Sequence, residues 1–159
     1  MLLLALMMSA LADPLPPVEL GVIPDPVVQA ARSASGLPLA DRMKAVSEPL
    51  LGLPYEIDGH GEGMGPDVDP PARYDAFDCV TFLEEVLALS LAPDPVGAPA
   101  IRNALRYRDG VPDYSGRHHF MLAQWIPANI EAGFFEDITH TLGETHRIEK
   151  TVTRAVWNN

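Results

Sequence analysis

The clearest pattern of apolar and polar positions in the chain runs from residue 77 to residue 91. Counted from Cys79, apolar residues recur after three, four, seven and eight positions: Phe82, Leu83, Val86 and Leu87. This spacing predicts one α-helix. The stretch has few polar residues, so most of its surface is expected to be buried. Asp78 is a suitable N-cap, because its carboxylate accepts hydrogen bonds from free backbone N–H groups, and Pro93 ends the helix.

Shorter patterns on both sides predict further elements. Apolar residues spaced along 39–48 predict an amphipathic helix that Pro49 kinks or ends. A short helical turn is expected at 27–34 and a second helix at 98–106. A third helix, or short helical pieces broken at Pro127, is expected at 119–130. Alternating β-branched residues at 147–156 predict a strand at or near a sheet edge.

Residues 56–73 have no apolar period and contain many glycines, so they are expected to form a loop. The loop comes just before Cys79 and could border a cleft. His60 with Asp58 and Glu62 could be interpreted as a metal site, but the spacing matches no known ligand pattern and a glycine-rich loop is a poor cage. We therefore predict no metal site, and the sequence supports no cofactor.

Length and charge restrict the class of protein. A chain of 159 residues suits one domain with one core. The net charge of −11 is spread along the chain. This argues against nucleic-acid binding, which needs a basic surface, and gives no attraction to anionic lipid.

The N-terminus has the pattern of an export signal. Residues 1–12 resemble a signal peptide, with an apolar run followed by Ala10, Leu11 and Ala12 in an A-x-A cleavage pattern. The basic residue usual near the start is missing, and a core strand or helix is the alternative. The run is too short to span a bilayer, so no membrane span is expected in the mature chain. We expect an exported, periplasmic protein with a Pro-rich linker at 13–34 and one domain at 35–159.

Cys79 is the only cysteine, so the chain cannot form an intramolecular disulfide. A thiol in the first turn of a helix experiences the positive end of the helix dipole, which favours the thiolate. The thiolate is the nucleophilic form and suits covalent catalysis. The alternative is a small buried apolar residue at the start of a helix. Position alone leaves both interpretations open.

Four segments together resemble one family. In order they are LGLPY at 51–55, DCVTFLEEVLAL at 78–89, LRYRDG at 105–110, and RHHF at 117–120 followed by WIPAN at 125–129. They resemble motifs of the N-acetylmuramoyl-L-alanine amidase-like proteins among the papain-like NlpC-type cell-wall hydrolases. The resemblance implies an α+β fold, here mainly the helical half of the papain-like cysteine hydrolase fold with a terminal β-strand. It also implies cleavage of the amide between N-acetylmuramic acid and L-alanine in peptidoglycan fragments (muropeptides), with Cys79 as the nucleophile.

A cysteine nucleophile needs a base, normally a histidine held by a third polar group. Among five histidines, His119 occupies the matching motif position and is the expected base; a structural histidine is the alternative. Tyr55, Asp78 and Arg117, all in matched motifs, are the expected substrate-binding residues.

For three arginines and one tryptophan, structural roles are favoured. Arg106, Arg108 and Arg117 could bind a carboxylate of the wall peptide. Pairing with Asp109, Asp113 or Glu84 is the preferred interpretation. Trp125 is expected in the core rather than as a sugar platform.

One family feature is absent. The related enzymes carry a downstream His-x-Gly segment for the base, and this chain has none. The chain is therefore expected to be a truncated or fragmentary member, or one that lost catalysis. The competing hypotheses are a catalytically incomplete exported binding module and a plain helical interaction domain. A helical half should also leave exposed apolar patches, or need a partner that covers them.

Overall fold

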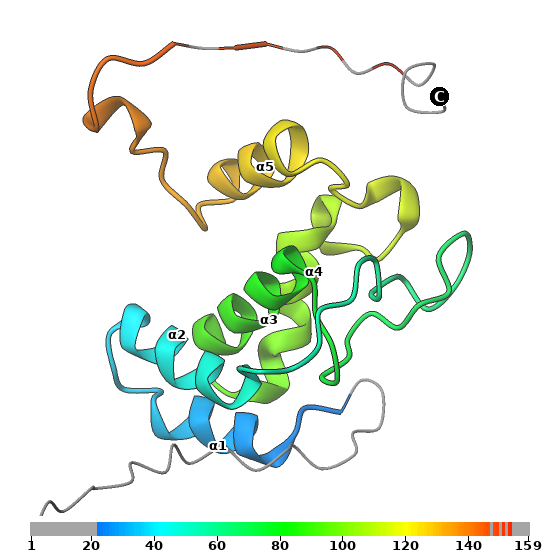
Figure 1. Ribbon diagram of the computed structural model, residues 1–159, viewed down its shortest axis with the longest axis vertical. Coiled ribbons are helices and arrows are strands. Elements are labelled where there is room, and N and C mark those ends of the chain that lie inside the picture. The colour runs from blue at the N-terminus through cyan, green and yellow to red at the C-terminus, as the bar shows by residue number, and fades with distance from the viewer. Residues whose placement is uncertain (1–21, 147, 150, 152, 154–159) are drawn as a thin grey trace, which may run out of the picture.

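The protein is mostly helical in the part that the computed structural model describes, residues 22–146, 148, 149, 151 and 153 (Figure 1). Over these residues the α-helices are α1 (Asp25–Ser33), α2 (Leu39–Ser47), α3 (Cys79–Leu91), α4 (Ala98–Arg106) and α5 (Ile126–Glu131). The helices predicted at 39–48, 79–91 and 98–106 are confirmed, and a 3₁₀ turn, Glu48–Leu50, follows α2 at Pro49.

No β-strand forms among the described residues, where pairing is limited to isolated bridges such as Tyr55 with Phe77. The strand predicted at 147–156 has no counterpart at residues 148, 149, 151 and 153. The rest of that stretch and the predicted signal peptide at 1–12 lie outside the described residues. The fold is therefore described as mostly helical.

Helix α3 lies at the centre and packs against both α2 and α4 (Figure 1). Asp78 has extended backbone and caps the helix with its carboxylate, as predicted. Every residue from Glu84 to Ser90 is buried, so α3 has little solvent-facing surface. This agrees with a segment whose apolar residues are not confined to one stripe.

Two apolar clusters form on different sides of α3. One joins α1, α2 and α3 through residues such as Val27, Val46 and Leu89. The other joins Leu87 of α3 to Leu105 of α4 and to Trp125, which is 3% exposed. Trp125 is thus a core residue, as predicted.

The first cluster includes residues of the segment 13–34, where the sequence predicts a Pro-rich linker and a short helical turn at 27–34. Residues 25–33 form α1, and the buried Val27 and Ala31 belong to the core. Pro26 lies in the first turn of α1, where a proline loses no helical hydrogen bond and its fixed φ suits the helix. Pro24 and Pro26 thus stand at a helix start, and the helical turn predicted at 27–34 is present as α1.

The predicted third helix is also different in detail. Residues Met121–Trp125 form a π-helical turn, and α5 follows at once. The change of helix type falls before Pro127, which lies in the first turn of α5 and does not break it.

Large apolar side chains are exposed on the described surface, as predicted. The most exposed are Ile57, Val68, Val96, Leu122, Leu142 and Ile148. Among the described residues no helix is both long enough and apolar enough to cross a membrane.

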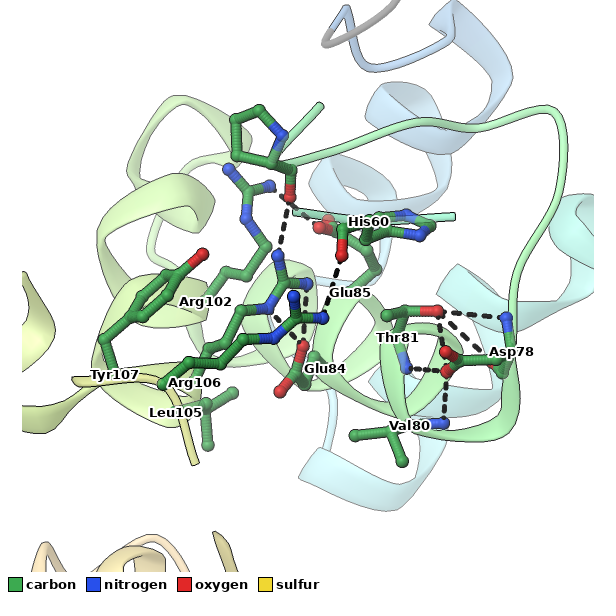
Figure 2. Close-up of polar contacts among 12 residues, drawn as sticks. His60, Asp78, Val80, Thr81, Glu84, Glu85, Arg102, Leu105, Arg106 and Tyr107 are labelled. Carbon is green, nitrogen blue, oxygen red and sulfur yellow. Dashed lines mark hydrogen bonds and ion pairs between the residues drawn. The ribbon is translucent and has the colours of Figure 1, made fainter. Parts of the chain in front are cut away.

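Two adjacent buried carboxylates join α3 to α4. Glu84 is paired with Arg106 at 2.7 Å and accepts a hydrogen bond from the indole Nε1 of Trp125 at 2.9 Å. Figure 2 shows Arg106 reaching from α4 to Glu84. Burial raises the pKa of Glu84, although Arg106 opposes the shift.

The neighbouring residue, Glu85, makes a second set of buried contacts. Its carboxylate accepts hydrogen bonds from Arg102 at 2.8 Å and from the Tyr74 hydroxyl at 2.9 Å. Burial and the nearby Glu85 carboxylate raise the pKa of Tyr74. Because Arg102 and Arg106 are one helical turn apart on α4, two ion pairs fix this helix against α3.

Loss of one arginine should be strongly destabilising. Arg106→Met leaves the Glu84 carboxylate buried without its cation, so the free energy of unfolding should fall by about 3–5 kcal/mol. Arg108→Met removes an exposed arginine and should change it by less than about 0.5 kcal/mol. Urea unfolding followed by circular dichroism measures both. Similar losses for the two variants would show that the buried pair does not hold the helices together.

Candidate functional site

Cys79 is the first residue of α3 and is exposed. Asp78 Oδ1 accepts hydrogen bonds from the backbone N of Val80 at 2.8 Å and of Thr81 at 2.7 Å. In return, Thr81 Oγ1 accepts a hydrogen bond from Asp78 N at 3.0 Å (Figure 2). This reciprocal cap fixes the first turn of the helix. It places the thiol at the protein surface, against the interpretation of Cys79 as a buried apolar residue.

Residues 54–56 run beside Phe77, two residues before Cys79. Phe77 N donates to Pro54 O, and Glu56 N donates to Phe77 O, each at 3.1 Å. This bridge aligns Tyr55 with Phe77. Tyr55, an expected substrate-binding residue, is 66% exposed and therefore lies at the surface next to the thiol.

A hollow of about 350 Å³ opens at this place, and we call it the apolar groove. Its walls are mainly leucine, proline and aromatic side chains, and Cys79 lines it. Leu51 and Tyr55 come from one side, and Phe82 from the first turns of α3. The groove gives the thiol an apolar surface on which a ligand can lie.

A second hollow of about 200 Å³, the polar cavity, lies next to Asp78. Its lining is mostly polar and charged: Asp58, Asp78, Thr81, Glu84, Arg106, Arg117, His118 and His119, with Val80, Met121 and Trp125. Asp78 borders both hollows. Cys79 lines only the groove, and His119 lines only the cavity.

His119, the expected base, is exposed, and its ring lies 4.7 Å from the Tyr114 ring. Its Nε2 is 2.8 Å from the Tyr114 carbonyl oxygen. A carbonyl only accepts, so Nε2 carries the proton and the Nδ1 lone pair is left as the basic site. No hydrogen bond joins His119 to Cys79 among the described residues, so the structure does not bring the two into contact.

Arg117 is engaged in protein contacts rather than free for a ligand. Its guanidinium pairs with Asp67 at 2.9 Å and donates to the carbonyl oxygen of His60 at 2.8 Å. Arg106 donates to Pro71 O at 2.8 Å. The two arginines thus hold both ends of the loop at 60–71. Structural pairing, the preferred interpretation, is present for both, although the acid that pairs with Arg117 is not one of those predicted.

Residues 59–62 of the loop before Cys79 are buried and closely packed, whereas residues 63–66 are exposed. A side-chain carbon at Gly61 would overlap the Asp67 carboxylate, and one at Gly59 would lie 3.0 Å from Arg73 Nη1. At Gly61 glycine is required for this close approach, a role that composition cannot distinguish from flexibility. Asp58 has a left-handed backbone, with φ of 59°, and its side chain is exposed at the polar cavity.

His60 is a residue whose environment the sequence did not predict. It is 1% exposed, and its ring stacks on Phe77 at 5.6 Å. Burial, with a contribution from Arg106, lowers the pKa of His60 to about 4. The ring is therefore neutral at pH 7, and it packs against Phe77, two residues before Cys79. No group of three or more metal-ligating side chains is present in the part of the chain that the structure describes.

Comparison with known proteins identifies relatives. The profile of the AmiA-like family, described as N-acetylmuramoyl-L-alanine amidase-like, matches residues 45–158. The crystal structure of protein LPG0564 from Legionella pneumophila, of the family DUF1460, is similar with a TM-score of 0.66 and 29% identity. The match covers 74% of this chain and 40% of the Legionella chain, so this chain spans less than half of that relative. No curated protein matches the chain.

Acid should weaken the fold through His60. Its pKa is about 4 in the folded chain and 6.5 ordinarily, so between these values the unfolded chain binds more protons. The contribution of the neutral ring to stability is fully present above about pH 6.5. It is lost as the pH falls to about 4, and amounts to roughly 3 kcal/mol.

Urea unfolding between about pH 7 and about pH 4 measures this effect. The difference in unfolding free energy between the native chain and His60→Gln should shrink by roughly 3 kcal/mol over that range. His140→Gln, at an exposed histidine, is the matched control and should show a constant difference. A constant difference for His60→Gln as well would contradict a buried neutral ring.

Proposed function

The chain belongs to the N-acetylmuramoyl-L-alanine amidase-like family, and we propose that it acts as a cysteine hydrolase of peptidoglycan fragments. The proposed reaction is cleavage of the amide between N-acetylmuramic acid and L-alanine. The observation that carries the proposal is the position of Cys79, exposed at the capped start of α3 and in the wall of the apolar groove. We also propose export to the periplasm, from the signal-like pattern of residues 1–12.

The start of α3 suits the chemistry of acyl transfer. The first N–H groups of a helix have no intrahelical acceptor. Asp78 takes those of Val80 and Thr81, and Phe82 N donates to Asp78 O. The N–H of Cys79 is left beside its own thiol. It is the proposed donor to the oxyanion that forms when Sγ attacks the carbonyl carbon.

The proton balance of the proposed reaction requires a base. The thiol proton passes to the base, and the tetrahedral intermediate collapses by breaking the C–N bond. The alanine nitrogen leaves with that proton, and water then hydrolyses the thioester to give the carboxylate of N-acetylmuramic acid. His119 is the proposed base through Nδ1, since Nε2 is occupied by Tyr114 O. Closing the distance to Cys79 requires a movement of the segment that carries His119.

The second candidate function is an exported module that binds muropeptides without cleaving them. The observation that favours it is the separation of thiol and imidazole, which line different hollows. In this case the same surface binds the ligand, and no thioester forms.

Mass spectrometry of N-acetylmuramoyl-L-alanyl-D-isoglutamine incubated with the protein distinguishes the two. A hydrolase releases N-acetylmuramic acid and the free dipeptide. Cys79→Ala should lower the rate by about a thousandfold or more, and His119→Ala by about a hundredfold or more. His140→Ala, at an exposed histidine, should leave the rate unchanged.

The remaining outcomes have separate meanings. Binding of the muropeptide without any cleavage would support the binding module and rule out the hydrolase. Cleavage that persists in Cys79→Ala would exclude Cys79 as the nucleophile. A chain that neither binds nor cleaves the compound would contradict both candidate functions.

A further inference from the structure

We propose that the two hollows bind the two halves of the substrate, which the scissile amide joins. The polar cavity takes the neutral N-acetylmuramoyl sugar, with Asp58 as a residue that determines specificity for its hydroxyl groups. The apolar groove takes the alanine end of the peptide. This assignment rests on the proposed function and deepens it. Its basis is that the hollows meet at Asp78, next to the thiol, and differ in chemistry.

The apolar groove suits an alanine methyl group and not a sugar. Beyond Cys79 itself, the Tyr55 hydroxyl and the Asp78 carboxylate are its polar side-chain groups, and Oδ1 of Asp78 is already used by the helix cap. Sugar hydroxyls placed against leucine and phenylalanine side chains would lose their water without gaining partners, which is costly. An apolar methyl gains by the same contact.

The described residues that line the polar cavity offer donors and acceptors, and both of their guanidiniums are paired. Arg106 is paired with Glu84, and Arg117 with Asp67. Three carboxylates, those of Asp58, Asp78 and Glu84, line the cavity with these two guanidiniums. The carboxylates of a wall peptide would therefore meet net negative charge. A neutral polyol that donates hydrogen bonds to carboxylate oxygens fits this lining better.

Asp58 is the carboxylate available for that role. Its side chain is exposed at the cavity, and it makes no hydrogen bond or ion pair with the residues that the structure describes. The carbonyl oxygen of His60, two residues further on, accepts a hydrogen bond from Arg117, which also lines the cavity. Asp58 is thus an unpaired carboxylate at the cavity, as a hydrogen-bond acceptor for hydroxyl groups should be.

Methyl NMR with two half-ligands tests the assignment. The protein is the full chain with Cys79→Ala, which binds without turnover. The probes are the amide of N-acetylmuramic acid, for the sugar half, and N-acetyl-L-alanine methylamide, for the peptide half. Met121 lines only the polar cavity and Leu53 only the groove, so their methyl signals report the two hollows. The sugar probe should shift Met121 and the alanine probe should shift Leu53.

Two added variants make the test independent of signal assignment. Asp58→Ala should weaken binding of the sugar probe about tenfold and leave the alanine probe unchanged. Leu51→Ser, at an exposed residue of the groove, should weaken binding of the alanine probe several-fold and leave binding of the sugar probe unchanged. Both changes are at exposed side chains, and unchanged spectra of the free variants confirm their folding.

The outcomes separate this assignment from the proposed function. If N-acetylmuramoyl-L-alanine binds but the sugar probe shifts Leu53 and is insensitive to Asp58→Ala, the assignment is overturned and the proposed function stands. If neither the joined compound nor the two halves bind, both are overturned. The assignment is supported if the sugar probe shifts Met121 and binds less tightly to Asp58→Ala, while the alanine probe shifts Leu53 and binds less tightly to Leu51→Ser.

Discussion

Two consecutive buried carboxylates on α3 determine how the rest of the described structure is arranged. Glu84 and Glu85 cannot remain unpaired away from water, and each is paired with an arginine of α4. Because Arg102 and Arg106 are one helical turn apart, both ion pairs form together in only one register of α4 against α3. Arg106 then continues outward to Pro71 O, and its carbonyl accepts a hydrogen bond from His118 N at 2.9 Å. One ion-paired unit therefore holds the helices, the loop before Cys79 and the segment that carries the histidines.

The site depends on this arrangement in a direct way. Helix α3 cannot shift along its axis without breaking both buried pairs, so its first residue is held at the surface. The Asp78 cap completes the first turn and leaves Cys79 in the wall of the apolar groove, next to Asp78, which borders both the groove and the polar cavity. Membership of the N-acetylmuramoyl-L-alanine amidase-like family gives the chemistry that such a thiol is proposed to perform. The charges of the cavity are largely used within the protein, which is why a neutral sugar is its proposed ligand.

Sequence patterns predicted the elements that are determined by residues close to one another in the sequence. The spacing of apolar residues gave α2, α3 and α4, and a capping residue gave the start of α3. They failed where distant residues decide. The helical turn predicted at 27–34 is present as α1, but its place in the core depends on the packing of Val27 in the first apolar cluster. Likewise, His60 is buried because Phe77 and Arg106 meet it across the fold, which no local pattern reveals. The partner of Arg117 could not be chosen from sequence for the same reason.

Protection of Cys79 by a ligand tests whether the thiol lies where the two halves of a muropeptide meet. The ligand is N-acetylmuramoyl-L-alanine with the scissile carbonyl reduced to a methylene, which cannot be cleaved. The rate of Cys79 alkylation by iodoacetamide is measured by mass spectrometry with and without it. A saturating ligand should slow alkylation about tenfold or more, in proportion to its occupancy of the site. An alkylation rate that stays the same while the ligand is bound would contradict the claim.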